Sequence, residues 1–152
     1  MTEEGIGRPD MPVAPGTVIP EFVVDPVPIQ NMKTMALLLR DPNPIHWDAD
    51  AVRDLGMGEG VINQGPTNMA YVINMLVAWT GSPANVRSLD VRFLDNVRGG
   101  ETVRAGGVVT GVEPADGPTV AHCDVWLAKQ DGTNALAGTA TVIVPTEEDE
   151  HE

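Results

Sequence analysis

Residues 66–80 have the sequence PTNMAYVINMLVAWT, and this stretch decides the fold. A helix tolerates proline in its first turn, so Pro66 suits a helix start. Eight apolar residues fall on nearly every side of such a helix: Met69, Ala70, Val72, Ile73, Met75, Leu76, Val77 and Ala78. A helix that is apolar all round is buried rather than half exposed. The sequence therefore predicts a central helix that other elements cover.

The segments after this helix change to the periodicity of strands. They cover residues 86–95, 102–114, 119–130 and 135–145. The turn sequences RGG, ADGP and QDG separate them, and their spacing suits an antiparallel meander. One long buried helix followed by antiparallel strands implies an α+β fold in which a sheet wraps around the helix.

Two shorter helices are expected before the central one. After a short strand that starts at residue 21, Asn31 is a suitable N-cap for the first helix. The pair Asp41-Pro42 ends this helix, because a residue before proline avoids the helical region. Its apolar stripe is expected to consist of Met32, Met35, Ala36 and Leu39. Asp48 is expected to cap the second helix, and Gly56 to end it.

The chain of 152 residues fits one domain, and its ends differ from its body in composition. Residues 1–20 are rich in Gly and Pro and are expected to form an N-terminal arm. Residues 21–146 form the expected domain. Residues 147–152 are nearly all acidic and are expected to be a disordered tail.

The charge and the composition exclude several classes of protein. The chain has 22 Asp and Glu against 9 Lys and Arg, a net charge of −13, whereas a nucleic-acid binder needs a basic face. No apolar run is long enough to span a bilayer, and the N-terminus lacks the features of a secretory signal. With Cys123 as the single cysteine, no internal disulfide is possible. We therefore expect a cytoplasmic protein without a membrane span.

The stretch DPNPIHWD, residues 41–48, places an acid and an imidazole on a stiff turn. Asp41 and His46 are five residues apart, and Pro42 and Pro44 lower the entropy of holding the loop bent. A carboxylate and an imidazole held in this way can share a water molecule, which the acid orients while the imidazole moves a proton. DPNP alone is more often only a turn, but the histidine at this spacing favours catalysis.

A candidate oxyanion donor lies at the start of the central helix. A helix N-terminus presents free N–H groups and a partial positive charge. The N–H of Gly65 has no side chain beside it and could closely approach a thioester oxygen. Adding or removing water next to a carbonyl needs such a donor for the enolate oxygen. Gln64, before this glycine, either touches substrate or braces the loop.

The sequence DPNPIH, residues 41–46, resembles the signature of the MaoC-like or (R)-specific enoyl-CoA hydratase and 3-hydroxyacyl-thioester dehydratase family. That signature is Asp, any residue, Asn-Pro, an aliphatic residue and His. The similarity continues through WDADAVRDLGMGEGVINQG, WTG and VRF, and it covers roughly residues 30 to 145. The resemblance implies a hot-dog fold. It also implies a homodimer, or a heterodimer with another hot-dog subunit.

By this resemblance, the chain interconverts a trans-2-enoyl thioester and an (R)-3-hydroxyacyl thioester of coenzyme A or acyl carrier protein. No metal or redox cofactor is needed, since coenzyme A enters as part of the substrate. Asp41 and His46 are the expected catalytic pair, and Gly65 supplies the oxyanion N–H. Gln64 and Asn43 complete the expected site, Asn43 by holding the loop through side-chain hydrogen bonds.

Two positions depart from the family pattern. Gln64 stands where the family usually has histidine, and residues 38–40 (LLR) stand where it usually has small residues and glycine. Arg40 either pairs with Asp41 and weakens it as a base, or it points to solvent. These departures leave open a non-catalytic subunit that shapes the acyl site of a partner hydratase. An acyl-CoA thioesterase is a third alternative, although residues 66–80 lack the acid that such enzymes commonly place there.

Other side chains are assigned structural roles. Trp47 is assigned to packing. His122 is expected on an exposed sheet face, with Cys123 on the buried face, because side chains alternate along a strand. Scattered arginines are expected to be solvated strand charges, some of which could meet coenzyme A phosphates. They are Arg87, Arg92, Arg98 and Arg104.

Overall fold

The computed structural model describes residues 12–113 and 116–145. The elements in chain order are β1 (Val18–Val24), α1 (Ile29–Leu39), the 3₁₀ turn η1 (Pro44–His46), α2 (Ala49–Asp54), α3 (Gly65–Thr80), the 3₁₀ turn η2 (Pro83–Asn85), β2 (Val86–Phe93), β3 (Val103–Glu113), β4 (Thr119–Lys129) and β5 (Asn134–Val144). Residues 1–11 of the expected arm and the expected tail, 147–152, lie outside the described ranges. Within those ranges, no helix has the length and hydropathy of a membrane span.

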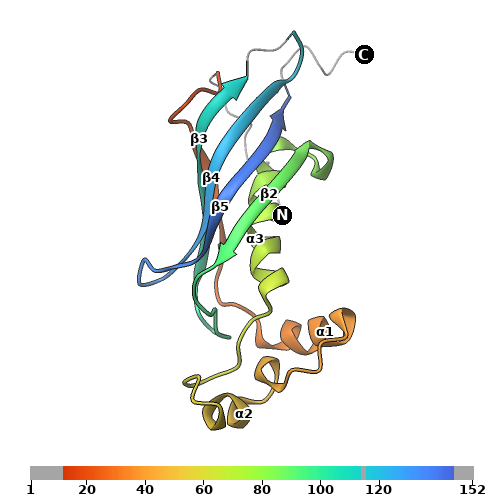
Figure 1. The fold of residues 1–152 in the computed structure, drawn as a ribbon, viewed down its shortest axis with the longest axis vertical. Coiled ribbons are helices and arrows are strands. Elements are labelled where there is room, and N and C mark those ends of the chain that lie inside the picture. The colour runs from red at the N-terminus through yellow and green to blue at the C-terminus, as the bar shows by residue number, and fades with distance from the viewer. Residues whose placement is uncertain (1–11, 114–115, 146–152) are drawn as a thin grey trace, which may run out of the picture.

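The five strands form one antiparallel sheet in the order β1-β3-β4-β5-β2. The predicted meander is correct for β3, β4 and β5. It is wrong for β2, which pairs with β5 at the far edge, because β1 occupies the other edge of β3. Figure 1 shows the sheet curving around α3, while α1 and α2 lie together beyond the start of that helix. The predicted α+β arrangement is confirmed.

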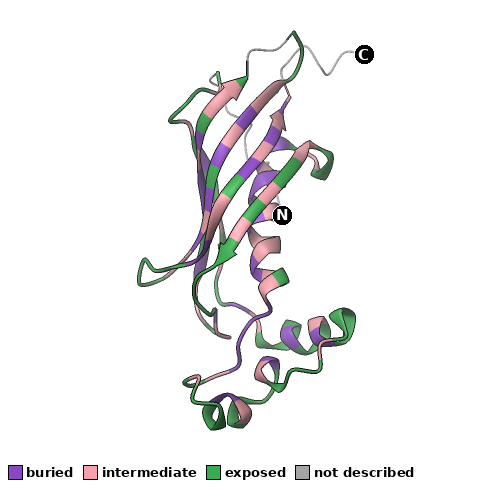
Figure 2. Ribbon diagram, viewed as in Figure 1, coloured by how far each residue is buried: buried purple, intermediate pink, exposed green. Residues whose placement is uncertain are grey.

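The central helix α3 is covered on one side by the sheet. Val72, Met75 and Leu76 are at most 1% exposed, and they pack in one core with inward residues of the strands such as Cys123. The opposite side, which includes Ile73, is apolar but only half buried (Figure 2). Full burial was expected from a helix that is apolar all round. A single curved sheet covers only one side of it.

The first strand starts earlier than predicted. β1 begins at Val18 rather than at residue 21, and Pro20 lies inside it. A strand tolerates proline at a sheet edge, where one N–H is not needed for pairing. β1 is an edge strand, and its register with β3 shifts between Ile19 and Phe22. Pro20 therefore belongs to an edge strand of the sheet and not to an arm that precedes it.

Helix α1 also differs from its prediction at the N-terminus. The N-cap is Pro28, without a capping side chain, and Asn31 lies inside the helix. The Pro28 carbonyl accepts from Asn31 N (3.3 Å), so the backbone closes this first turn without the expected Asn31 cap. Of the predicted stripe, Met32 and Ala36 are buried, whereas Leu39 is 42% exposed.

Helix α2 begins as predicted. Oδ1 of Asp48 accepts hydrogen bonds from Asp50 N (2.9 Å) and Ala51 N (3.3 Å). Gly56, just beyond the end of the helix, has φ 69°, a conformation that glycine adopts readily.

Candidate active site

The turn of residues 41–46 is held by its own side chains. Oδ1 of Asp41 accepts a hydrogen bond from Asn43 N (3.0 Å), and Oδ1 of Asn43 accepts one from Ile45 N (3.3 Å). The second bond caps the 3₁₀ turn η1. Together they fix the turn and leave Oδ2 of Asp41 for another partner.

That partner is His46. Its Nε2 lies 3.2 Å from Oδ2 of Asp41, and its Nδ1 lies 2.6 Å from the carbonyl oxygen of Ile62. A carbonyl oxygen only accepts, so Nδ1 carries a hydrogen. A neutral His46 would then turn a lone pair toward a carboxylate. A hydrogen bond between His46 and Asp41 at this distance therefore needs a hydrogen on Nε2 or on Oδ2.

The two side chains differ in exposure. The His46 side chain is 9% exposed, whereas that of Asp41 is 34% exposed. The imidazole is thus enclosed and oriented by the Ile62 carbonyl, while the carboxylate lies open to a ligand. The pair is therefore open to solvent on the Asp41 side.

The backbone joins this pair to the start of α3. Ile62 N donates to Ile45 O (2.9 Å), so the segment that holds His46 is paired with the segment that leads into α3. Gly65 follows Ile62 by three residues, a span of at most about 11 Å even for a fully extended chain. The acid, the imidazole and the first turn of α3 therefore lie in one region.

Gly65 is the first residue of α3, where N–H groups have no acceptor within the helix. The Gln64 carbonyl takes up the amides of Thr67 (3.0 Å) and Asn68 (3.1 Å). A Cβ at Gly65 would lie 3.2 Å from the Phe93 ring, which is closer than ordinary contact. The absence of a side chain lets Phe93 approach the helix start directly.

Gln64 is almost fully buried, with 1% exposure. Its Nε2 donates to the carbonyl oxygen of Met32 (2.8 Å), which braces α1 against the start of α3. Its Oε1 is buried and has no hydrogen-bond partner among the described residues.

Next to Gln64, the side chains of Asn63, Asn68 and Tyr71 form a polar group that the sequence did not predict. Asn63 Nδ2 donates to Asn68 Oδ1 (2.8 Å), and Tyr71 lies near the Asn63 side chain. Burial raises the pKa of Tyr71, and the nearby Asn63 side chain opposes this effect. The signal available in the sequence was the presence of Asn and Tyr within an otherwise apolar helix.

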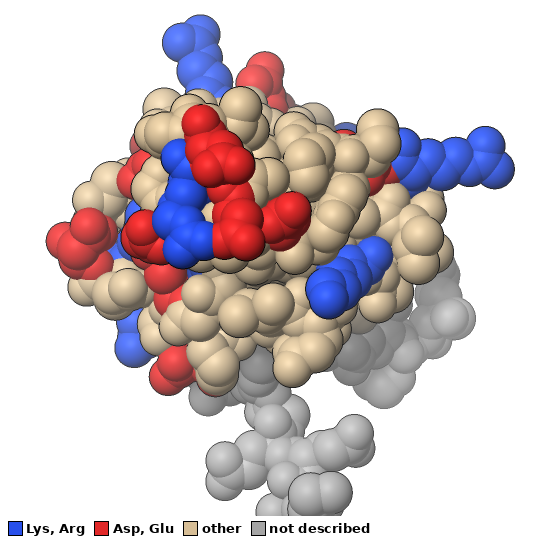
Figure 3. Space-filling view, turned by 90° about the horizontal axis from the view of Figure 1, so that it is seen from below, with Lys and Arg blue, Asp and Glu red and all other residues tan. Residues whose placement is uncertain are grey.

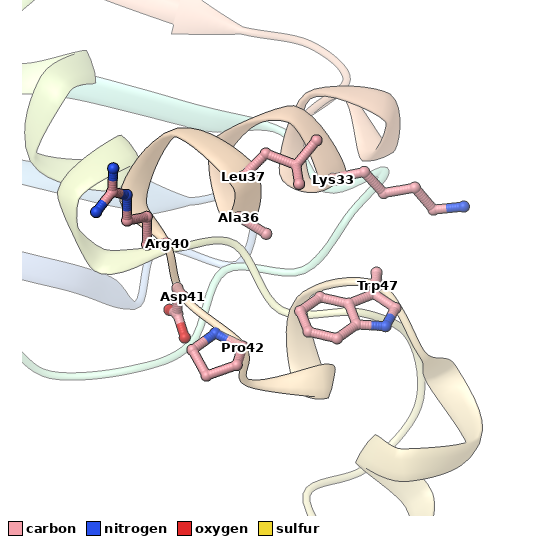
Figure 4. Close-up of a pocket in the computed structure, with 7 residues that line it drawn as sticks. All are labelled: Lys33, Ala36, Leu37, Arg40, Asp41, Pro42 and Trp47. Carbon is pink, nitrogen blue, oxygen red and sulfur yellow. The ribbon is translucent and has the colours of Figure 1, made fainter.

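A groove of about 590 Å³ opens beside Asp41 (Figure 4). Its walls are Lys33, Ala36, Leu37, Arg40, Asp41, Pro42 and Trp47. Trp47, predicted to pack, lines this groove with 38% exposure. Figure 4 shows the Arg40 guanidinium directed away from the Asp41 carboxylate, which corresponds to the second of the two alternatives for this residue. Lys33, Leu37 and Arg40 are spaced as residues on one side of a helix, and this spacing could have predicted that they line the same groove.

Arg98 is not the solvated strand charge that was predicted. Its guanidinium donates to the carbonyl oxygens of Glu59 and Gly60, both at 3.0 Å, and to that of Met57. A Cβ on Gly58 would lie 3.0 Å from its Nη2, so glycine lets the loop close over the guanidinium. Arg98 therefore anchors the loop that leads into Ile62.

His122 contacts residues of the sheet and none of the candidate site residues. Nε2 of His122 lies 2.9 Å from Oε1 of Glu113, and Nδ1 lies 3.2 Å from the Thr141 hydroxyl. Cys123 beside it is buried, as the strand alternation predicted. Arg104 pairs with Glu21 (3.3 Å).

Comparisons with known proteins give a family and a fold. The family model described as "MaoC like domain" matches residues 10–131. A comparison with curated protein sequences found no match.

Solved structures match over most of the chain. The (R)-hydratase from A. caviae involved in PHA biosynthesis is 21% identical, with a TM-score of 0.76 over 90% of this chain and 99% of that one. R-hydratase PhaJ1 from Pseudomonas aeruginosa is 19% identical, with a TM-score of 0.75 over 91% and 84%. The ChsH1-ChsH2 complex from Mycobacterium tuberculosis is 23% identical, with a TM-score of 0.72 over 88% and 99%. The predicted hot-dog fold is confirmed.

Proposed function

The chain belongs to the MaoC-like domain family, and from this premise we propose that it is a hydro-lyase. It interconverts a trans-2-enoyl thioester and an (R)-3-hydroxyacyl thioester, with acyl-CoA as the preferred form of the substrate. The observation that carries this proposal is the contact between His46 Nε2 and Asp41 Oδ2, at 3.2 Å, with Nδ1 fixed on Ile62. A pair that shares one proton suits a reaction that takes one proton from water and gives one to carbon.

In the hydration direction, the Asp41 carboxylate accepts a proton from water while the water oxygen attacks C3 of the enoyl group. The enolate oxygen that forms on the thioester is stabilised by the Gly65 N–H and the partial positive charge of the α3 N-terminus. Nε2–H of the His46 imidazolium then gives its proton to C2. The proton on Asp41 passes to His46 across their contact and restores the starting state. Dehydration follows the same steps in reverse.

The proposed protein acts as a homodimer or as a heterodimer with another hot-dog subunit. The apolar side of α3 that the sheet leaves half buried supports this, because a second chain would cover it. In a heterodimer the chain could also be the non-catalytic partner. Hydration by the isolated chain would favour the catalytic role, and activity that appears only with another subunit would not.

The test compares Asp41→Asn and His46→Ala with the wild type in the hydration of crotonyl-CoA or a bulkier enoyl-CoA. Removal of a general acid or base lowers turnover by about 10²- to 10⁴-fold. Asp124→Asn and His122→Ala are matched controls, because they remove the same chemical groups from the sheet face. Full activity in both Asp41 and His46 variants would contradict the assignment.

A further inference from the structure

Helix α1 ends at an arginine in a conformation that favours glycine. Arg40 is its C-cap, with φ 51° and ψ 40°, and it is the only non-glycine residue with positive φ in the described part of the chain. Side chains with a Cβ rarely adopt this left-handed region, and glycine commonly ends helices there. Arg40 thus stands at a position where glycine would adopt the backbone conformation with less strain. Such a departure from the preferred residue points to a use for the guanidinium.

The groove beside Asp41 gives this cation a place to act. Arg40 and Lys33 both line it, seven residues apart on α1, which corresponds to about 10 Å along the helix. Figure 4 shows Lys33 and Arg40 on opposite sides of the labelled residues, with their charged ends pointing away from each other and with Asp41 and Trp47 between them. The middle of the groove is apolar, through Ala36, Leu37 and Pro42. A ligand that fits it has an apolar body and an anionic group.

The two cations are uncompensated within the described ranges. Neither Lys33 nor Arg40 forms an ion pair there, whereas Arg53 pairs with Asp50, and Arg104 pairs with Glu21. In Figure 3, which views the end that carries α1 and α2, acidic side chains gather on one side, and a cationic side chain stands alone in an uncharged area. Arg87 and Arg92 also form no ion pair among the described residues, but Lys33 and Arg40 are the two cations that line this groove, where they can attract an anion to a chain of net charge −13.

We propose that this groove binds an anionic group of the thioester substrate and that Arg40, with Lys33, is the specificity-determining contact. The identity of the ligand as a thioester rests on the proposed function. The anion has two possible sources, which share the chemistry that a guanidinium recognises. It is either a phosphate of the coenzyme A or phosphopantetheine arm, or a carboxylate on the acyl chain.

The test measures binding without turnover, so that it does not depend on catalysis. Titration calorimetry gives the Kd of three saturated thioesters that cannot be hydrated: butanoyl-CoA, butanoyl-N-acetylcysteamine and glutaryl-N-acetylcysteamine. They carry phosphates, no charge and a carboxylate, respectively. The variants are Arg40→Gly, which suits the left-handed backbone, Lys33→Gln, and Arg104→Gln as a control that removes one cation elsewhere.

Arg40→Gly and, to a smaller extent, Lys33→Gln are expected to raise the Kd of an anionic thioester by about five- to tenfold. The neutral thioester should bind all proteins equally, and Arg104→Gln should match the wild type. A loss confined to butanoyl-CoA assigns the anion to phosphate, and a loss confined to the glutaryl thioester assigns it to a carboxylate. Equal Kd values for Arg40→Gly and wild type with both anionic ligands would overturn the proposal. So would an equal loss with the neutral ligand, or a wild type that binds none of the three.

Two further readouts separate this proposal from others. The thermal midpoint of Arg40→Gly should equal or exceed that of the wild type, because glycine relieves the left-handed conformation, so a weaker Kd would not reflect unfolding. Failure of the proposed function would appear instead as absent crotonyl-CoA hydration in a wild type whose anion binding still depends on Arg40.

Discussion

Two contacts decide what His46 can do. The Ile62 carbonyl fixes the hydrogen on Nδ1, and Nε2 lies 3.2 Å from Oδ2 of Asp41. The imidazole is enclosed by the protein, whereas the carboxylate faces the groove. The division of labour in the proposed reaction follows from these positions, since the exposed acid handles water and the enclosed imidazole holds the proton for carbon.

Gly65 offers a residue-scale prediction about the oxyanion donor. Gly65→Ala should lower kcat for crotonyl-CoA hydration by about tenfold or more, because the new Cβ meets the Phe93 ring and shifts the N–H. Steady-state kinetics check this. The double variant Gly65→Ala/Phe93→Ala makes room for the Cβ and should recover part of the loss. No recovery would show that displacement by Phe93 is not the cause.

Cys123 offers a prediction about alkaline pH. Burial, together with Asp124 nearby, raises the pKa of this thiol from 9.0 to about 11, so the folded protein keeps the proton that the unfolded chain loses. The stabilising effect is complete below pH 9 and is lost as the pH rises toward 11. The free energy of unfolding in urea should therefore fall by up to about 2 kcal/mol more in the wild type than in Cys123→Ala over this range. Equal slopes with pH in the two proteins would contradict the shift.

At the scale of elements, the loop between α2 and α3 is the part that positions the pair. Arg98 binds three of its carbonyls, and Gly99 N donates to Val61 O (3.1 Å), beside the Ile62 that orients His46. Val61 and Ile62 at the end of the loop are buried, whereas residues 57–60 are half buried or exposed, so the polar bonds to Arg98 hold this first part in place. Arg98, which lies outside this loop in the sequence, thus holds the segment that leads to Ile62, whose carbonyl orients the His46 imidazole.

Arg98→Ala tests this arrangement. It should lower the free energy of unfolding by about 1–3 kcal/mol, because carbonyls that it satisfied lose their partner. Urea denaturation measures this, with Arg104→Ala as a control whose exposed pair should change stability by less than about 1 kcal/mol. Hydrogen exchange of the Ile62 amide should accelerate only in Arg98→Ala. Unchanged exchange there would exclude Arg98 as the anchor of the loop.

At the scale of the whole molecule, the side of α3 that faces away from the sheet is apolar but only half buried. Met69, Ile73 and Val77 are half buried on one side of a helix whose other side forms the core. Contiguous apolar surface of this kind marks an interface in soluble proteins. The proposed dimer would cover it.

The proposed assembly can be tested by its mass in solution. Wild-type protein should elute as a dimer in size-exclusion chromatography with light scattering, alone or with a second hot-dog subunit. Ile73→Lys should shift it toward the monomer, because a buried unpaired charge opposes association. An unchanged dimer in Ile73→Lys would contradict an interface through α3.

The sequence by itself determined the elements and the chemistry of the short motif. Helical and strand periods, together with Gly and Pro at the turns, set α2, α3 and the strands β3, β4 and β5, because these signals act between neighbours in the chain. The turn of residues 41–46 was predictable for the same reason, since Asp41 and Asn43 bind amides two residues away.

Only the tertiary structure decided the contacts between distant segments. The pairing of β2 with β5, the bond from His46 to Ile62 and the brace from Gln64 to Met32 join residues separated by 16 residues or more. The inclusion of Pro20 in β1 has the same cause, because a strand tolerates proline only where it lies at the edge of a sheet. The groove beside Arg40 likewise exists only where α1 meets the loop of Trp47. Local patterns carry no information about which distant surfaces meet, and that choice is made by burial and by the satisfaction of polar groups across the whole fold.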